Sequence, residues 1–335
     1  MELLFLDENL EVISAPVDDF VSFTWAERWY ESGNFQLYLP SYRFGAVRYA
    51  RYIYNQDKDE CAKITSRNYD ESTAKDNLVV GGRMLGHLLN QRVINTEKII
   101  NDTLENAVYS LMTQFALTGD RLIPELELAP QRGYDDLYNG TIKAGTQLDK
   151  ALYDMLKPYG MTYRIRYDFY NKTLIFSVEK GLDRTQEQEE NTWAIFSDNF
   201  ENLINTSYND SVDDYRNFAY VADGNNVITV DLTGGGERYE LYISGKTYQD
   251  GVEALAQYPY IETARGDIDT QGNLAYGVDY SIGDKCDIVM TKLNLVMSSQ
   301  ITAVDHVCET AGIRVIPQFG EEKLNIRAYI ERELK

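Results

Sequence analysis

Hydrophobic and polar residues alternate in short runs at the start of the chain. Apolar side chains recur at every second position in residues 20–25, and again in residues 35–39, where Pro40 ends the run. Residues 47–54 and 61–65 continue the pattern on either side of a polar stretch. A period of two, with Asp, Asn and Gly between the runs, predicts short half-buried β-strands. The last two runs predict a hairpin with a long loop.

The spacing of the apolar residues becomes helical in the middle of the chain. Residues 84–89 place their apolar side chains on one face, which predicts a short helix. Apolar residues recur at intervals of three and four from Thr96 to Phe115, which predicts the longest helix, and again over residues 148–156. Residues 163–178 alternate around a central polar turn, which predicts a hairpin packed on a helix.

A polar segment from Gly181 to Asn191 separates this helical region from a second region of alternating runs. Its Asp, Glu, Gln and Arg content is typical of a linker, so we predict a domain boundary there. Beyond it the turn at Asp223-Gly224 indicates hairpins, and residues 246–257 predict one short helix. We therefore predict an α+β fold that is predominantly β, with β-rich regions at residues 1–95 and 189–335 and an αβ segment at residues 96–188.

Composition and charge narrow the possible functions. The 335 residues include 53 acidic and 32 basic side chains, which give a net charge of −21. This sign repels a phosphate backbone and argues against a conventional nucleic-acid-binding protein. The cysteines and histidines are too few for a typical zinc site, and the cysteines are too few for a disulfide framework. These residues are Cys61, Cys286, Cys308, His87 and His306.

The chain start and the aromatic content add two expectations. Residues 1–7 lack a basic region, and no stretch approaches about 18 uncharged apolar residues, so we expect no secretion signal and no stable membrane insertion. Tyrosine accounts for 26 residues against 12 phenylalanines and 3 tryptophans. Tyrosine suits half-buried strand faces and subunit contacts, although a sugar-binding surface would use it as well.

One glycine-rich corner resembles a nucleotide-binding loop only in part. Gly81, Gly82 and Gly86 lie between a predicted strand and a predicted helix. The dinucleotide fingerprint G-x-G-x-x-G needs a glycine where Arg83 stands, and the βαβ context is missing. We therefore interpret this segment as a strand-to-helix turn.

A second motif resembles the front of a calcium loop. Asp267, Asp269, Gln271 and Gly272 have the alternation of oxygen ligands and the glycine of such a loop. The twelfth position holds Val278 in place of the bidentate glutamate, and strands flank the motif. A polar hairpin turn is the favoured interpretation, and we assign no metal ligand.

The remaining charged and nucleophilic residues form no catalytic motif. Alternation in a strand would place His306 and Cys308 on one face, but no cysteine-enzyme context surrounds them, and His87 lies on an apolar helix face. The acid-rich loops at residues 57–60 and 186–190 are interpreted as solvated charge. A glycosidase needs only two carboxylates at a suitable distance, and an acidic chain always contains such pairs. The sequence therefore does not indicate which residues would form a glycosidase site. We assign no catalytic or cofactor-binding residue and no cofactor.

Five blocks of residues, spread over the whole chain, carry a family resemblance. They are Phe23-Thr24-Trp25-x-x-Arg28-Trp29-Tyr30-x-x-Gly33-x-Phe35-x-Leu37-Tyr38-Leu39-Pro40, Gly82-Arg83-x-Leu85-x-x-Leu88-Leu89-x-x-Arg92, Gly181-x-Asp183-Arg184-Thr185, Phe200-x-x-Leu203 leading into Tyr215-x-Asn217-x-Ala219-Tyr220-Val221, and Tyr276-Gly277-x-Asp279-Tyr280-x-Ile282-Gly283-Asp284 followed by Ile301-Thr302-x-Val304 and Pro317-x-Phe319-Gly320. In this order they resemble the tail-hub family of siphophages, the non-contractile counterpart of the central hub in contractile phage baseplates.

The resemblance implies a structural virion protein of a phage or prophage and not an enzyme. Residues 1–95 and 189–335 would be two barrel-like domains, so that three subunits supply six around the sixfold tail tube. The homotrimer would join this tube to the threefold tail tip and close or line the DNA channel. Its implied partners are the distal tail protein ring, the tape-measure protein and tip or fibre receptor-binding proteins, with DNA only as transported cargo.

Two other functions stay open on the sequence. The first is an envelope polysaccharide hydrolase that uses an Asp/Glu pair in an aromatic cleft. Many hubs carry lytic modules in a long C-terminal extension, whereas this sequence stops at Lys335, so the resemblance leads us to expect no lytic role. The second is a saccharide-binding or Ca²⁺-binding module centred on Asp267–Gly272.

Overall fold

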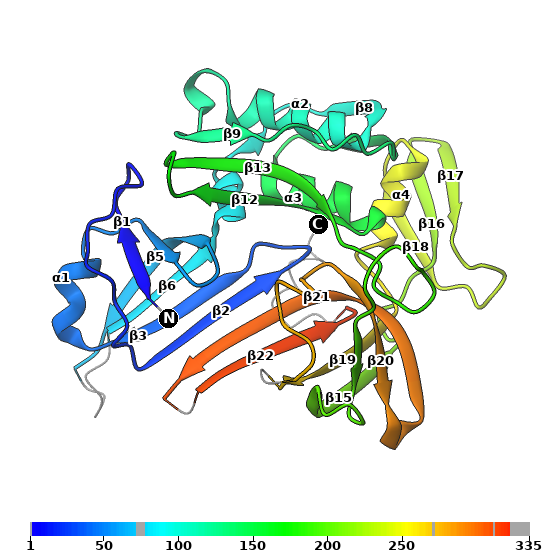
Figure 1. Ribbon diagram of the computed structural model, residues 1–335. Coiled ribbons are helices and arrows are strands. Elements are labelled where there is room, and N and C mark those ends of the chain that lie inside the picture. The colour runs from blue at the N-terminus through cyan, green and yellow to red at the C-terminus, as the bar shows by residue number, and fades with distance from the viewer. Residues whose placement is uncertain (1, 72–77, 270–271, 311, 322–335) are drawn as a thin grey trace. The chain divides into compact units, whose positions relative to one another are not determined.

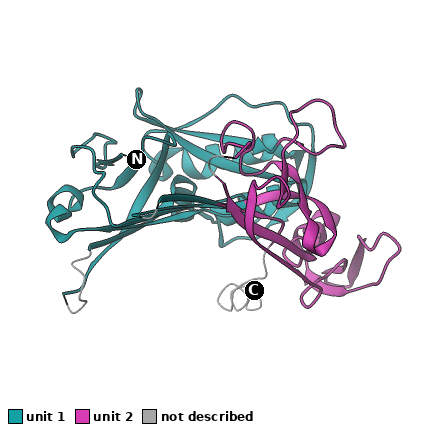
Figure 2. Ribbon diagram, turned by 60° about the horizontal axis from the view of Figure 1, so that its bottom comes forward, with its two compact units in different colours: residues 1–181, 303–315 teal, residues 182–302, 316–335 magenta. Residues whose placement is uncertain are grey.

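The chain divides into two compact units in a computed structural model that describes residues 2–71, 78–269, 272–310 and 312–321. Unit 1 comprises residues 1–181 and 303–315, and unit 2 comprises residues 182–302 and 316–335 (Figure 2). The domain limits that we predict at residues 95 and 188 remain predictions, because the limits of these two units do not show where domains begin or end.

Unit 1 contains an antiparallel sheet whose strands come mostly from the first 84 residues (Figure 1). Its order is β1, β4, β5, β6, β3, β2 and then residues 303–309 of β21. Alternate side chains of β2 and β3, such as Phe23, Trp25, Phe35 and Leu37, are buried in one core. The strands are β1 (Leu3–Leu6), β2 (Ser22–Arg28), β3 (Asn34–Leu39), β4 (Tyr52–Asn55), β5 (Glu60–Tyr69), β6 (Leu78–Met84) and β21 (Leu295–Glu309).

A second core of unit 1 lies between helices and a small sheet (Figure 1). Leu152, Met155 and Leu156 of one helix pack with Tyr163 and Phe176 of the predicted hairpin. The elements are α2 (Leu104–Ala116), α3 (Leu148–Leu156), β9 (Leu126–Leu128), β12 (Met161–Asp168) and β13 (Thr173–Lys180). The paired strands β7 (Val93–Ile94) with β11 (Thr146–Gln147) and β8 (Lys98–Thr103) with β10 (Leu137–Ile142) complete it. The predicted hairpin on a helix is confirmed.

The long predicted helix is wrong in its first part. Residues 98–103 form β8, and α2 begins only at Leu104. Thr103 caps the helix, because its side chain accepts a hydrogen bond from the backbone of Asn106. The apolar spacing of residues 96–103 fitted a helix, but strand pairing with β10 determines the structure of this segment.

Several short elements differ from the predicted strands. Residues 47–54 hold the end of a helix and then β4, so the predicted strand is half correct. The predicted helix at residues 84–89 is a 3₁₀ helix that follows β6, as a strand-to-helix turn requires. The short helices of unit 1 are η1 (Ser41–Arg43), α1 (Phe44–Val47), η2 (Leu85–Gln91), η3 (Gly119–Arg121) and η4 (Lys157–Tyr159).

The described residues of unit 2 form mainly strands and one α-helix. β15 pairs with β19, and β20 pairs with β14 and with the first part of β21. Between β15 and β19 the chain forms a three-stranded sheet, and α4 packs on it. Thr247 and Asp250 form a capping box at the start of this helix. The elements are β14 (Ile195–Ser197), β15 (Leu203–Ser211), β16 (Phe218–Asp223), β17 (Asn226–Asp231), β18 (Glu240–Ser244), α4 (Tyr248–Leu255), β19 (Ile261–Ile268), β20 (Lys285–Met290), η5 (Thr291–Leu293) and residues 316–319 of β22 (Gly312–Phe319).

The α+β class with a predominance of strands is confirmed. Among the described residues, no strand pairing closes the sheet of either unit, so the two predicted barrel-like domains are not confirmed. The polar segment after Gly181 has little regular structure, as predicted for a linker, but it is fixed in place. Asp284 and Asp287 accept hydrogen bonds from the backbones of Leu182 and Gln186.

Strands β3 and β5 lie so close to Gly82 of β6 that a side chain at this position would test the strand arrangement directly. A Cβ atom at Gly82 would lie 2.0 Å from the carbonyl oxygen of Lys63 and 2.4 Å from the ring of Phe35. Gly82→Ala is therefore expected to lower the free energy of unfolding by about 3 kcal/mol or more in urea denaturation. Gly45→Ala is the matched control, since nothing lies within 4 Å of its added methyl group. Equal stability of the two variants would contradict this strand arrangement.

Candidate functional site

The strongest candidate site in unit 1 begins with a carboxylate at a core position of β2. Phe23, Trp25 and Glu27 lie on the same face of this strand because side chains alternate. The Glu27 side chain is only 3% exposed. His306 of β21 stands opposite Trp25 in the strand register, and its side chain is also buried. The fold therefore brings an acid and an imidazole together inside unit 1.

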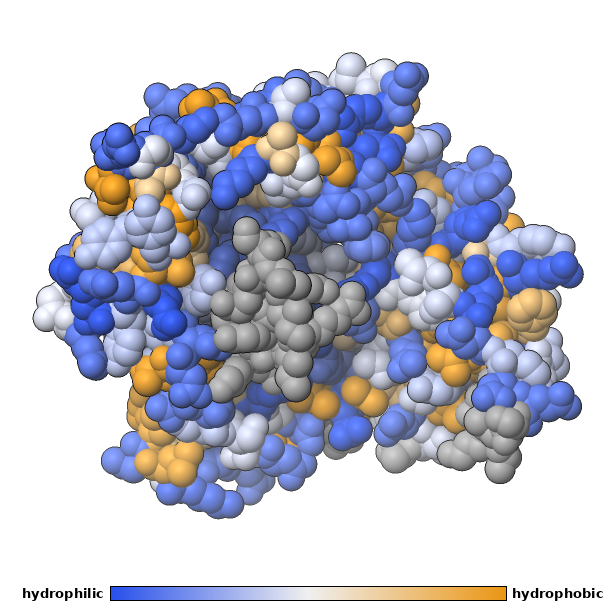
Figure 3. Space-filling view, turned by 180° about the vertical axis from the view of Figure 1, so that it is seen from behind, coloured by the Kyte–Doolittle hydropathy of each residue, from blue (hydrophilic) through white to orange (hydrophobic). Residues whose placement is uncertain are grey.

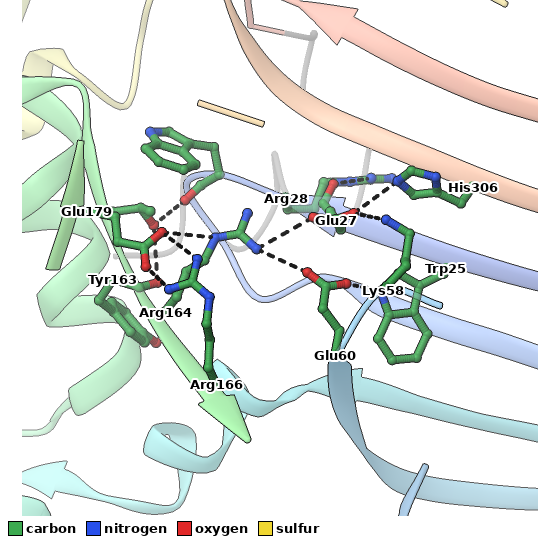
Figure 4. A network of polar contacts seen from close by, with 12 residues as sticks. Trp25, Glu27, Arg28, Lys58, Glu60, Tyr163, Arg164, Arg166, Glu179 and His306 are labelled. Atoms are coloured by element: carbon green, nitrogen blue, oxygen red, sulfur yellow. Dashed lines mark hydrogen bonds and ion pairs between the residues drawn. The ribbon is translucent and has the colours of Figure 1, made fainter. Parts of the chain in front are cut away.

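Glu27 contacts three nitrogen-bearing side chains from three different segments (Figure 4). Its Oε1 lies 2.8 Å from Nζ of Lys58 and 2.9 Å from Nε2 of His306, and its Oε2 lies 3.5 Å from Nη1 of Arg164. Burial alone would raise the pKa of Glu27, but Lys58, His306 and Arg164 hold it well below its usual value. Glu27 is consequently a carboxylate at neutral pH.

His306 complements this carboxylate as a neutral ring. Burial lowers the pKa of His306, and the hydrogen bond with Glu27 opposes that effect only in part. A neutral imidazole that faces a carboxylate donates from the facing nitrogen, so Nε2 of His306 carries the proton. The pair is a hydrogen bond between a charged acceptor and a neutral donor.

Glu60, the first residue of β5, is the second carboxylate of the network. It accepts a hydrogen bond of 2.6 Å from Nε1 of Trp25 and lies 3.7 Å from Arg164. Burial and the neighbouring charge of Glu27 raise the pKa of Glu60 to about 7, against the opposing effects of Lys58 and Arg164. The two glutamates therefore have pKa values shifted in opposite directions.

Arg164 connects these groups to the β12–β13 hairpin. In β12 the residues Tyr163, Ile165 and Tyr167 enter the second core, so Arg164 and Arg166 point to the other face. Figure 4 shows Arg164 between Glu179 on one side and Glu27 and Glu60 on the other. Nε of Arg164 lies 3.8 Å from Oε2 of Glu179.

Glu179 of β13 completes the network on the hairpin. It receives hydrogen bonds from both terminal nitrogens of Arg166, and the hydroxyl of Ser177 donates to it over 3.0 Å. Although burial would raise the pKa of Glu179, these bonds and the nearby guanidinium groups keep it below its usual value. Three glutamates are thus matched by Lys58, Arg164 and Arg166.

A small cavity adjoins the network and decides what chemistry it can perform. Its volume is about 60 Å³, and Glu27, Glu60, Tyr153, Tyr163 and Arg164 are among its lining residues. A carboxylate beside a carboxyl group of raised pKa is the arrangement of an acid–base pair. Pockets that bind small organic ligands enclose about 300–1,000 Å³, so this cavity accommodates a few water molecules and no sugar ring.

The sequence had not indicated this network. Residues 57–60 were interpreted as solvated charge, and that interpretation is wrong for Lys58 and Glu60, which face Glu27 and Arg164. The alternation in β2 was the available signal, because it places Glu27 in line with Phe23 and Trp25 on the core face. By contrast, the glutamates of residues 186–190 are exposed, as predicted.

The glycine-rich corner serves packing. Gly81 and Gly82 lie within β6, and Gly86 lies in η2, where an added Cβ atom would come 3.2 Å from the hydroxyl of Tyr153. The interpretation as a strand-to-helix turn is confirmed. His87, in the same 3₁₀ helix, is half-buried, and burial lowers its pKa.

The structure does not assemble the other candidate residues into a site. Burial raises the pKa of the Cys308 thiol, which disfavours the thiolate that a nucleophile needs. Asp267 accepts a hydrogen bond of 2.8 Å from Asn205, and the backbone of Gly272 donates to that of Asp269 in a turn. Gln271 lies outside the described residues. Within the described ranges, no group of three or more His, Cys, Asp or Glu residues could hold a metal ion.

One further property concerns membranes. Across the described part of the chain, no helix combines the length and the apolar character needed to cross a bilayer.

Comparisons with known proteins identify a family from the sequence and a shared fold from the structure. The model of the Siphovirus ReqiPepy6 Gp37-like protein family matches residues 2–321. No curated protein matches the sequence. The structure is similar to a tail protein from Neisseria meningitidis MC58, with a TM-score of 0.59 and 10% identity over 96% of both chains.

Two other solved structures share this fold. Prophage tail protein gp18 from Listeria monocytogenes EGD-e has a TM-score of 0.61 and 12% identity over 100% of this chain and 98% of that one. The 43 kDa tail protein of prophage MuSo2 from Shewanella oneidensis has a TM-score of 0.57 and 12% identity over 95% and 97% of the two chains.

The raised pKa of Glu60 gives the network a pH dependence that can be measured. Because this pKa lies above its usual 4.5 in the folded protein, ionisation of Glu60 lowers the stability as the pH rises through about 7. Glu60→Gln keeps an acceptor for Trp25 and removes the charge. We expect urea denaturation to find the variant about 1–3 kcal/mol more stable than the wild type at pH 8 and equal to it at about pH 4, below the usual pKa of 4.5, where Glu60 is largely protonated in both the folded and the unfolded protein.

The comparison of the two chains at each pH isolates this effect. His306 and Glu27 contribute in the opposite direction, because their lowered pKa values make the protein less stable as the pH falls. Both chains share these residues, so the difference between the two chains reports the ionisation of Glu60 together with its electrostatic coupling to Glu27. A variant that is less stable than the wild type at pH 8 would show that Glu60 is needed as a charge.

Proposed function

The chain belongs to the siphovirus ReqiPepy6 Gp37-like protein family, and on that premise we propose that it forms a trimeric hub ring at the tail tip. Membership of this family and the fold shared with phage tail proteins give it a structural role in a phage tail. The observation that carries the proposal is the family match, which extends over nearly the whole chain. The ring would join the sixfold tail tube to the threefold tip.

The exposed tyrosines support a role in assembly. Tyr42, Tyr49, Tyr170 and Tyr242 expose between 68% and 93% of their surface. Tyrosine is enriched in protein interfaces, because its ring buries a large apolar area while the hydroxyl stays hydrogen-bonded. Several such side chains on one subunit are consistent with contacts to more than one neighbour.

The proposed partners follow from the place of a hub in the tail. The ring would contact the distal tail protein ring on one side and tip or fibre proteins on the other, and the tape-measure protein and DNA would pass its channel. A net charge of −21 repels a polyanion, so DNA would move through as cargo and would not bind.

A polysaccharide hydrolase is the second candidate, and one observation favours it. Glu27 and Glu60 have pKa values shifted in opposite directions, as an acid–base pair requires. The cavity of about 60 Å³ beside them argues against it. Release of reducing sugar from host envelope polysaccharide, abolished by Glu60→Gln in a folded variant, would establish the hydrolase in place of the purely structural role.

The trimer is tested by the mass and shape of the purified protein. Light scattering is expected to give three times 38.4 kDa, and negative-stain images are expected to show rings with a central hole. The mass must fall on dilution if it reflects reversible assembly. A mass of one subunit at every accessible concentration would contradict the proposed ring.

A further inference from the structure

Charge is distributed very unevenly along this acidic chain. Residues 40–56 contain three arginines and no acidic residue, whereas residues 185–215 contain eight acidic residues and no lysine or arginine. The first segment belongs to unit 1 and the second to unit 2. On the face shown in Figure 3, apolar residues lie in small groups among polar ones. We therefore examine whether the basic segment and the acidic segment bind surfaces of opposite charge.

The basic segment forms a surface of arginines and aromatic rings around α1. We define the basic–aromatic surface as Tyr42, Phe44, Arg48, Tyr49 and Arg51. Tyr42 and Tyr49 are 70% and 69% exposed, and the guanidinium group of Arg48 lies 5.1 Å from the ring centre of Tyr49. Arginine and tyrosine are both enriched among the residues that contribute most of the binding energy in protein interfaces.

The positive charge of this surface is not neutralised within the described residues. Arg43 forms an ion pair of 2.8 Å with Asp19, but neither Arg48 nor Arg51 pairs with a described carboxylate. Arg51 also crowds other cations, because after burial it is the main neighbouring charge that lowers the pKa of Lys63 and of Arg67. An acidic partner would relieve this repulsion.

An acidic loop of unit 2 supplies the complement. We define the acidic loop as Glu187, Glu189, Glu190 and Trp193. The three glutamates are exposed and form no ion pair with a described residue, and Trp193 is 49% exposed. Nε1 of Trp193 donates to the carbonyl of Gln188 over 2.9 Å, which fixes the loop conformation. A loop ordered before binding loses little entropy on association.

We propose that the basic–aromatic surface of one subunit binds the acidic loop of a second copy of this chain. The two surfaces differ, so the contact is head-to-tail, and three such contacts close a ring. This inference rests on the proposed trimer and names its interface. A second copy is favoured over nucleic acid because the exposed rings outnumber the unpaired arginines and the net charge of −21 repels phosphate.

Charge reversal on each surface tests the pairing. The variants are Arg48→Glu with Arg51→Glu, Glu187→Lys with Glu189→Lys, and a chain that carries all four changes. Lys143→Glu with Lys292→Glu is the control, because both lysines are exposed and lie outside the two surfaces. Light scattering and sedimentation at low ionic strength give the mass of each full-length variant, and thermal unfolding verifies that each one folds.

The wild type and the control are expected to form trimers, and each double variant is expected to assemble at least about tenfold more weakly. The fourfold variant restores opposite charges across the contact and is expected to regain the trimer. Raising the salt from about 50 mM to about 500 mM should weaken the wild-type trimer, since exposed charges are screened.

The outcomes separate this inference from the proposed ring. Wild-type trimers that persist in both double variants would overturn the interface and leave the ring intact. A wild type that never assembles would overturn the ring, and the interface with it. Duplex DNA that binds the wild type but not the Arg48→Glu/Arg51→Glu variant, with an unchanged mass, would assign the surface to nucleic acid.

Discussion

Unit 1 depends on the burial of one carboxylate. An ionised Glu27 inside the fold is tolerated only when cations and donors surround it, because an unpaired buried charge costs several kcal/mol. Lys58, Arg164 and His306 meet this requirement from the β4–β5 turn, β12 and β21. The contacts fix how the first sheet, the hairpin and the returning strand of unit 1 meet.

The same network explains why unit 1 includes residues from the end of the chain. His306 is separated from Glu27 by 279 positions, yet β21 pairs with β2 along its last seven residues and places the imidazole on the core face. Arg28 and Asp305 strengthen this strand pair with an ion pair of 2.7 Å. The returning strand is therefore part of unit 1 by both backbone pairing and side-chain charge.

The sequence predicted the elements that local residue patterns determine. It missed the elements and contacts that depend on residues far apart in the chain. The hairpin at residues 163–178 and the helix at 148–156 follow from alternation and helical spacing, and the order of five blocks indicated the tail family. The strand at residues 98–103 depends on pairing with β10, and the roles of Lys58, Glu60 and His306 depend on contacts far apart in the sequence. A single sequence contains no signal for such contacts beyond an acid on a core face.

Hydrogen exchange of the Glu27→Gln variant tests most directly whether this carboxylate holds the segments together. Under conditions in which the variant stays folded, the account predicts faster exchange in β2, β12 and residues 303–309 together, because Lys58 and Arg164 lose their buried counter-charge. The sheet of β16, β17 and β18 should exchange as in the wild type, since it belongs to the other compact unit and has a core of its own. Faster exchange confined to β2 would contradict the account.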